Sequence, residues 1–233
     1  MIIAIDGTVA SGKSTVAKKL AEKIGYFYIN TGLMYRGVAA FARINNIPTN
    51  DSDKIANLVV KLKLDLKDVN GKQHIFVNDE DLTEFAIVPD IGSYVSNVAD
   101  NPEVRKLLVS EQRRLGLEAG DAVLEGRDIG SDVFPDADIK FYVTADSRER
   151  AHRRLADDQK KNPDLTIDDV EKAILDRDKR DKERPIGALK KMSDSIEIDT
   201  TNLSIDEVVD LLIRLWSTEI KSAKCVSNLK AGF

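Results

Sequence analysis

The stretch from residue 7 to residue 14 limits the possible folds of this chain more than any other. It reads Gly-Thr-Val-Ala-Ser-Gly-Lys-Ser, the G-x-x-x-x-G-K-S pattern of a phosphate-binding loop. The apolar run at 2–5 predicts a buried parallel strand before it, and residues 15–24 carry the apolar stripe of a helix. Strand, loop and helix therefore follow one another in the order that this loop requires.

The residue types in the loop suit the binding of a nucleoside triphosphate. Glycines at positions 7 and 12 allow backbone N–H groups to approach a phosphate chain closely. Lys13 is expected to reach the β- and γ-phosphates, and the Ser14 hydroxyl is the expected ligand of Mg²⁺. The predicted nucleotide-binding residues are Gly7, Thr8, Val9, Ala10, Ser11, Gly12, Lys13, Ser14 and Thr15.

Length and composition narrow the class of protein. The 233 residues suit a single α/β domain with insertions. No apolar run approaches the roughly 20 residues that cross a bilayer, and the N-terminal run lacks the basic leader of a signal peptide. The single cysteine, Cys225, excludes an internal disulfide, and the net charge of −5 argues against a broad nucleic-acid surface. We expect a cytoplasmic monomer without a membrane or nucleic-acid partner.

Apolar runs and helical stripes alternate along the rest of the chain. Further buried strands are predicted at 25–29, 122–125, 139–143 and 195–198. Helices are predicted at 31–43, 54–61, 89–99, 102–118, 147–160, 166–184 and 205–215. This alternation favours a five-stranded parallel sheet covered by helices on both faces. No pattern predicts a structure for 221–233.

Residues 62–82 interrupt this alternation. Their apolar side chains recur at every second position, as in Leu62, Leu64 and Leu66, and Asn70-Gly71 separates the two halves. An Asn-Gly pair between alternating stretches is a strong signal for a β-hairpin. We therefore expect a small antiparallel sheet inserted into the parallel fold.

Arginines gather in the last third of the chain, at 148, 150, 153, 154, 177, 180 and 184. A solvated helix face with ion pairs would explain them without a ligand. Arg36 and Arg127, however, follow predicted strand ends, where ligands bind in open α/β sheets. Planar guanidinium groups suit phosphate recognition, which indicates a second phosphate beside the triphosphate. Transfer between two anions requires such cations, and an ionised phosphate acceptor requires no catalytic base.

Several motifs accompany the phosphate-binding loop in order along nearly the whole chain. They are Asn30-Thr-Gly-Leu-Met-Tyr-Arg36, Val98-Ala-Asp-Asn-Pro-Glu-Val-Arg105, Glu125-Gly-Arg-Asp128 with Val133-Phe-Pro-Asp-Ala137, Arg150-Ala-His-Arg-Arg154 and Arg177-Asp-Lys-Arg-Asp181. The loop alone occurs in many families of proteins, whereas the combination of these motifs fits a far narrower range of families. With them the chain resembles the bacterial cytidylate kinases, a branch of the nucleoside monophosphate kinases.

The resemblance implies a P-loop NTPase fold with an acceptor-binding insert at about 37–100 and a short helical lid at about 148–165. It implies phosphorylation of CMP and dCMP to CDP and dCDP, with ATP as the donor and Mg²⁺ as the cofactor. Arg150, Arg153 and Arg154 match the lid that closes over the triphosphate. The implied catalytic residues are Lys13, Arg127, Arg153 and Arg154, and the implied acceptor-binding residues are Thr31, Tyr35, Arg36, Ser96, Arg105, Arg127, Asp128, Arg177, Asp181 and Arg184.

In that family, Asp128 and Arg105, together with Ser96, match the positions that read cytosine. Asn30 and Glu125 depart from the family pattern, because aspartate is common at both positions. The alternative functions are another small-molecule P-loop kinase, acting on UMP, thymidylate or shikimate, and a regulatory nucleotide switch. The sequence lacks the Asn-Lys-x-Asp motif that reads guanine, which argues against the switch.

Overall fold

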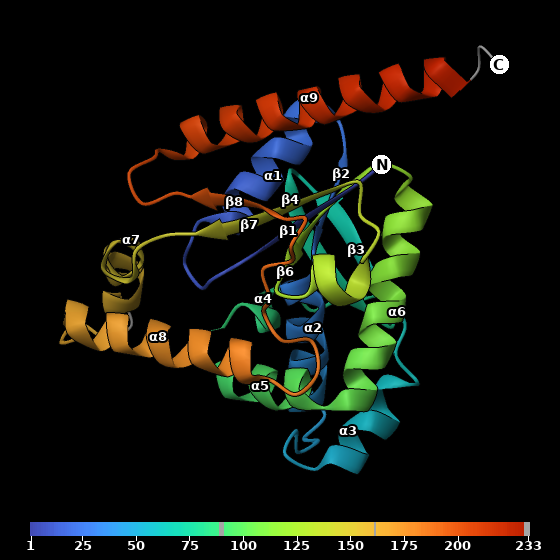
Figure 1. The fold of residues 1–233 in the computed structure, drawn as a ribbon. Coiled ribbons are helices and arrows are strands. Elements are labelled where there is room, and N and C mark those ends of the chain that lie inside the picture. The colour runs from blue at the N-terminus through green and yellow to red at the C-terminus, as the bar shows by residue number, and fades with distance from the viewer. Residues whose placement is uncertain (89–90, 161, 231–233) are drawn as a thin grey trace.

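The structure, a computed structural model, describes residues 1–88, 91–160 and 162–230. Its centre is a parallel sheet of five strands in the order β2-β6-β1-β7-β8 (Figure 1). Strand β1 is the central strand and pairs in parallel with β6 and β7. The C-terminal ends of parallel strands form the edge of the sheet at which α/β proteins bind ligands, and the loop at 7–14 follows β1 at that edge. The strands are β1 (Ile2–Gly7), β2 (Phe27–Asn30), β6 (Ala122–Gly126), β7 (Ile139–Thr144) and β8 (Ile196–Asp199).

Both faces of the sheet are covered by helices, because successive side chains of each strand point to opposite sides. Ile3 and Ile5 lie in a core with α1 (Lys13–Ile24) and α9 (Ile205–Lys230). Ala4 lies in a second core with α2 (Thr31–Ile44) and α6 (Pro102–Ala119). Figure 1 shows α1 and α9 on one side of the sheet and α2 on the other. The predicted α/β class is confirmed.

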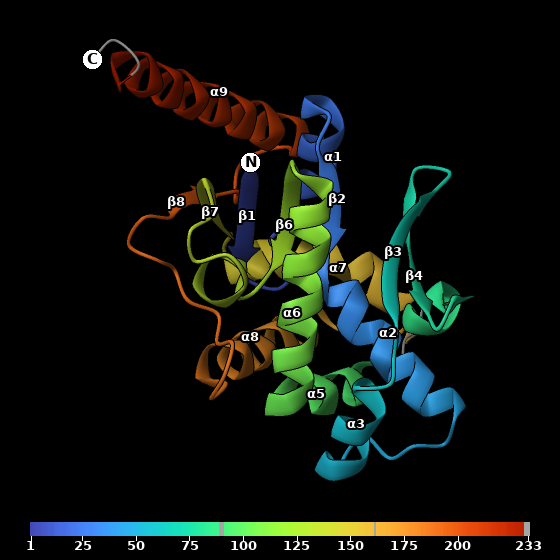
Figure 2. The same cartoon turned by 90° about the vertical axis from the view of Figure 1, so that its right-hand side faces the viewer.

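The predicted insert is a three-stranded antiparallel sheet, β3 (Leu64–Val69), β4 (Lys72–Val77) and β5 (Glu80–Asp81). Asn70 and Gly71 make the turn between β3 and β4, with φ of 54° and 73°. Figure 2 shows this sheet standing beside the parallel sheet, next to α2. It packs closely there, since a Cβ at Gly37 of α2 would lie 2.4 Å from Ile75 Cγ1. Short helices complete this side of the molecule: α3 (Ser52–Val59), α4 (Thr83–Ala86) and α5 (Gly92–Asp100).

Two helices, α7 (Ser147–Gln159) and α8 (Ile167–Glu183), lie together at the C-terminal edge of the parallel sheet. Their contact is lined by a small apolar cluster of Val9, Ala151, Val170 and Ile174. Asp146 caps α7, and Thr166 begins α8 with the predicted capping box, in which Asp169 is the partner. The cluster includes Val9 of the phosphate-binding loop, so these helices contact the loop directly.

The structure adds several elements that no sequence pattern predicts. These are β5, α4 and a π-helical turn at Ile129–Val133. Helix α9 continues to Lys230, whereas 231–233 lie outside the described residues, as does the predicted start of a helix at Pro89. Within the described residues, no helix has the length and apolar character needed to cross a membrane.

Candidate active site

The phosphate-binding loop adopts its shape through two glycines with different roles. A Cβ at Gly7 would lie 2.0 Å from Val143 O of β7, so only glycine allows this contact between neighbouring backbones. Gly12 has φ of 84°, a left-handed conformation that favours glycine, directly before α1 begins. Inside the loop, Thr8 O accepts hydrogen bonds from Ser11 Oγ at 2.9 Å and from Lys13 Nζ at 3.2 Å. The loop thus encloses the Lys13 ammonium group at the N-terminus of α1.

Lys13 lies among other cations. Burial, followed by the charge of Arg127, lowers its pKa to about 7. Burial, followed by Arg127, also lowers the pKa of Arg177 to about 10, with smaller effects from Arg36 and Arg154. The pKa of Arg36 is lowered by burial and then by Arg154 and Arg127. These five cations, which come from five segments of the chain, therefore converge on one region, and such a concentration of positive charge suits a polyanion.

Glu125 at the end of β6 joins the loop to the neighbouring strand. Its Oε1 accepts a hydrogen bond from Ser14 Oγ at 2.8 Å and another from Tyr28 OH at 3.4 Å. Its backbone oxygen accepts from Thr31 Oγ1 at 2.8 Å. Hydroxyl and carboxylate oxygens are the ligands that Mg²⁺ prefers. Ser14 Oγ and Glu125 Oε1 are oxygens of this kind at the loop. Within the described residues, no group of three or more His, Cys, Asp or Glu could hold a metal ion.

Asp181 of α8 pairs with two of the predicted phosphate-binding arginines. Its Oδ2 accepts from Arg127 Nε at 2.8 Å, and its Oδ1 accepts from Arg184 Nη2 at 3.1 Å. Arg184 Nε also donates to Asp100 Oδ1 at 2.8 Å. Burial opposes ionisation of Asp181, but the two arginines lower its pKa below the ordinary value. The Asp181 carboxylate is therefore ionised and holds both guanidinium groups in place.

Arg105 and Asp128 form an ion pair in a buried pocket next to this region, with exposed fractions of 3% and 4%. Arg105 Nη1 also donates to Ala99 O at 3.0 Å, and the guanidinium carbon lies 5.4 Å from the centre of the Tyr35 ring. Burial raises the pKa of Asp128, and Arg105 opposes that shift. Arg105 Nε is buried without a hydrogen-bond partner among the described residues, and Tyr35 OH lies buried beside the Gln112 amide. Such groups favour a polar ligand or ordered water.

The side chains of three further residues named in the sequence analysis, Arg36, Ser96 and Asn30, form hydrogen bonds with backbone groups. Arg36 Nη1 donates to Ala86 O at 3.4 Å, the one hydrogen bond of this guanidinium found among the described residues. Ser96 lies on α5, and its hydroxyl donates to Gly92 O of the same helix at 3.1 Å. In the described part of the chain, no hydrogen bond joins Ser96 to Arg105 or Asp128. Asn30 accepts from Leu33 N at 3.0 Å and so acts as the N-cap of α2.

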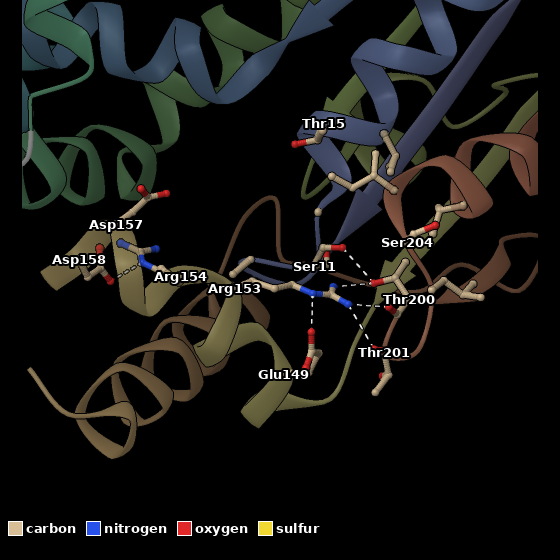
Figure 3. Close-up of a pocket in the computed structure, with 16 residues that line it drawn as sticks. Ser11, Thr15, Glu149, Arg153, Arg154, Asp157, Asp158, Thr200, Thr201 and Ser204 are labelled. Carbon is tan, nitrogen blue, oxygen red and sulfur yellow. Dashed lines mark hydrogen bonds and ion pairs between the residues drawn. The ribbon is translucent and has the colours of Figure 1, made fainter. Parts of the chain in front are cut away.

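The cavity in Figure 3 lies between the loop, α7 and the chain after β8, and its volume is about 750 Å³. Arg153 points toward the chain after β8 and donates to Thr200 O at 2.6 Å and Thr201 O at 3.3 Å. Arg154 points away from them and donates to Asp158 Oδ2 at 2.7 Å. Both predicted arginines thus line a cavity that is large enough for a nucleoside.

Arg150, the first arginine of the Arg150–Arg154 motif on α7, is held by other parts of the protein. Its side chain is buried, and it donates to Val9 O and Ala145 O, each at 2.9 Å, and to Asp178. The family resemblance places Arg150 in the lid with Arg153 and Arg154, and that placement stays a prediction; among the described residues its guanidinium donates to protein acceptors. It holds the phosphate-binding loop from outside.

Two polar residues of the site were not predicted. The Asp6 carboxylate at the end of β1 accepts from Ile129 N at 2.9 Å and Gly130 N at 2.8 Å, and burial raises its pKa to about 7. It thereby holds the segment that follows Arg127 and Asp128. Gln73 of β4 accepts from Asn30 N at 2.7 Å and donates to Tyr28 O, which ties the inserted sheet to β2. The only signal in the sequence for the role of Asp6 was its position, as an acidic residue directly after the apolar run at 2–5.

Comparisons with known proteins agree with this geometry. A family model described as cytidylate kinase matches residues 3–218. The chain is 43% identical over 211 residues to the cytidylate kinase of Bacillus subtilis, covering 91% of this chain and 94% of that protein. It is 44% identical over 221 residues to a bifunctional pantoate ligase/cytidylate kinase of Prochlorococcus marinus, covering 94% of this chain but 43% of that protein's length.

A solved structure shares the fold at low sequence similarity. It is an uncharacterised protein from Eubacterium ventriosum, with a TM-score of 0.51 and 18% identity. The match covers 94% of this chain and 98% of that one. The order of elements described above therefore recurs in a protein of quite different sequence.

Proposed function

Because the chain belongs to the cytidylate kinase family, we propose that it transfers the γ-phosphoryl group of ATP to CMP and dCMP, forming ADP with CDP or dCDP. The observation that carries the proposal is the convergence of Lys13, Arg36, Arg127, Arg154 and Arg177 beside the buried Arg105–Asp128 pair. Two phosphate groups can approach each other only where such cations offset their repulsion.

The residues divide between the two substrates. Lys13 and the loop amides bind the triphosphate, and Arg153 and Arg154 cover it from α7. Arg36, Arg127 and Arg184 bind the acceptor phosphate, whereas Arg177 and Asp181 bind the ribose. Tyr35 and Thr31 support this side from α2. The acceptor oxygen is already ionised, so the protein has to align the two phosphates and stabilise their charge, and it needs no base.

Arg105 and Asp128 discriminate between pyrimidine bases. Cytosine offers an amine donor beside two acceptors, which suits a carboxylate paired with a guanidinium. Uracil would place a carbonyl against Asp128, and two buried acceptors facing each other are a costly mismatch. Ser96 completes the base site once its hydroxyl leaves Gly92 O on binding of CMP.

The family resemblance also implies an acceptor-binding insert and a lid. We assign the acceptor-binding insert to about 37–100 and the lid to about 148–165, in which residues 89–90 and 161 lie outside the described chain. The insert contributes the sheet that Gln73 ties to β2. The lid contributes Arg153 and Arg154 through α7.

Mg²⁺ would be held by Ser14 Oγ, with Glu125 linked through water. When bound, Mg²⁺ neutralises charge on the β- and γ-phosphates. Replacing Glu125 with glutamine removes the charge 2.8 Å from Ser14 Oγ, so the Mg²⁺ concentration that gives half-maximal rate is expected to rise about tenfold. The measurement is a Mg²⁺ titration of ADP formation. Glu125→Asp, which keeps the charge, and the surface change Glu118→Gln should stay within about twofold of the unmodified protein, and a similar rise in Glu118→Gln would refute the assignment.

ATP binding is expected to take up protons above pH 7. The lowered pKa of about 7 leaves Lys13 largely neutral at pH 8.5, and a neighbouring triphosphate returns it toward its ordinary value of 10.5. Uptake of up to about one proton is therefore expected at pH 8.5, and ATP affinity should fall as pH rises from 7 toward 10. Calorimetry in buffers of different ionisation enthalpy measures this uptake. Lys13→Met should abolish it and Lys19→Met, on the same helix, should not; uptake that persists in Lys13→Met would disprove the assignment.

One assay tests the proposed reaction directly. The protein is incubated with ATP and Mg²⁺ and with CMP, dCMP, UMP or AMP, and ADP formation is followed. We expect turnover with CMP and dCMP that greatly exceeds turnover with UMP and AMP. Absence of turnover with CMP, or faster turnover with UMP, would overturn the proposal.

A further inference from the structure

Val9, at the tip of the phosphate-binding loop, is enclosed by the two helices of the lid region. Its side chain is 3% exposed and packs in the apolar cluster with Ala151 of α7 and with Val170 and Ile174 of α8. A residue at the tip of a nucleotide-binding loop could instead face solvent or ligand. Its burial in a cluster separate from the two main cores shows that the loop is seated in α7 and α8.

Both backbone polar groups of Val9 are bonded to one ion pair. Val9 N donates to Asp178 Oδ1 at 2.9 Å, and Val9 O accepts from Arg150 Nη1 at 2.9 Å. Arg150 and Asp178 also bind each other, and their side chains are only 6% and 7% exposed. Arg150 Nε donates to Ala145 O at 2.9 Å, which fixes the guanidinium relative to the end of β7. The pair thus holds the loop at a single residue from two directions.

We propose that the Arg150–Asp178 ion pair is a positioning device that sets the phosphate-binding loop for ATP. The inference rests on the proposed function only in that this loop binds ATP. Burying two charges is expensive, and an apolar pair of the same size is often at least as stable, so stability alone does not explain the pair. What an apolar pair could not do is bind the N–H and the C=O of Val9 together.

The backbone directly after Val9 supports this role. Ala10 has φ of 58°, a left-handed conformation that is unfavourable for a residue with a Cβ. Such a conformation persists only where the surrounding contacts enforce it. The Arg150–Asp178 pair fixes the peptide groups on both sides of Val9 and so directs the chain into this turn. The amides that follow, up to Ser14, are then held in one arrangement before a phosphate arrives.

The Arg150–Asp178 pair contacts the loop that binds ATP and not the residues proposed to bind CMP. Asp178 follows Arg177 and precedes Asp181 on α8, yet its carboxylate turns toward Val9, whereas Asp181 pairs with Arg127 and Arg184. Loss of the pair should therefore weaken the binding of ATP and leave the binding of CMP nearly unchanged. A general loosening of the fold would weaken the binding of both ligands.

The test is a double variant, Arg150→Met with Asp178→Leu, which leaves no unpaired buried charge. By calorimetry without the second substrate, the Kd for ATP is expected to rise about tenfold or more, since two hydrogen bonds to the loop are lost, while the Kd for CMP stays within about twofold. An unchanged ATP Kd, or equal losses for both ligands, would overturn the proposal. Should the double variant not fold, Arg150→Lys gives the same comparison: it keeps the charge, so a smaller rise for ATP alone is expected.

Arg148→Gln provides the matched control. Arg148 also joins α7 to α8, through Asp168 and Glu171, but on the exposed side and without contact to Val9. Its ATP Kd should remain within about twofold, and a rise equal to that of the double variant would mean that helix packing, not the hold on Val9, sets the loop. Binding of ATP is measured without turnover. A protein that binds ATP but leaves CMP unphosphorylated would therefore refute the proposed function and not this inference.

Discussion

Replacing Arg127 with alanine is expected to lower kcat/KM for CMP at least about a hundredfold. Arg127 contributes to the cation cluster around Lys13 and Arg177, and the contacts to phosphate oxygens that we propose for it would strengthen as charge develops during transfer. The loss should fall mainly on kcat, because the neighbouring arginines still bind the phosphates. Steady-state ADP formation over a range of CMP concentrations measures both parameters.

The control for this variant is Arg180→Ala. Arg180 is an exposed arginine of α8 whose Nε donates to Asp176 O of its own helix at 3.3 Å. Its removal should change kcat/KM by less than about twofold, as is usual for exposed positions. If Arg127→Ala lowers kcat/KM for CMP by less than about tenfold, Arg127 does not contact the reacting phosphates.

Replacing Asp128 with alanine is expected to weaken CMP binding about a hundredfold and to leave ATP binding within about twofold. The change removes the acceptor for the cytosine amine and leaves Arg105 as a buried charge without its partner. Because that charge also destabilises the fold, the thermal midpoint should fall as well. Calorimetric Kd values for CMP and ATP, measured below that midpoint, separate the two effects.

Two further variants sharpen this result. Asp132→Ala removes a neighbouring carboxylate that does not pair with Arg105, and both Kd values should stay within about twofold. Asp128→Asn can donate to a carbonyl, so it should raise the rate with UMP relative to CMP. Equal weakening of CMP and ATP in Asp128→Ala would show that Asp128 supports the fold and does not read the base.

The sequence predicted those features that depend on neighbouring residues. The loop at 7–14 is recognisable because its glycines, lysine and serine have fixed spacing, and the hairpin because Asn70-Gly71 separates alternating stretches. Arg127 could be expected at the site because it follows a predicted strand, and Asp128 because the motif Glu125-Gly-Arg-Asp128 resembles that of the family. In each case the signal and the structure it predicts lie within a few residues of each other.

The features that escaped prediction depend on partners far away in the chain. Asp6 binds backbone amides more than a hundred residues later, and nothing near Asp6 indicates that segment. Arg150 lies one helical turn before Arg153 and Arg154, so helical periodicity places all three on one side of α7. The bonds of Arg150 to Val9 and Asp178, which lie in two other segments, make it a support of the loop, and no local pattern indicates these partners.

The pairing of Asp181 with Arg127 and Arg184 means that the acceptor site carries its own counter-ion. A phosphate that enters meets two of its arginines already paired with a carboxylate, so its binding should depend less on ionic strength than binding to a wholly unpaired arginine cluster would. If the ribose then draws Asp181 toward its hydroxyls, the sugar itself frees the arginines for the phosphate. Inorganic phosphate, which has no sugar to make this exchange, should be a poor competitor of CMP.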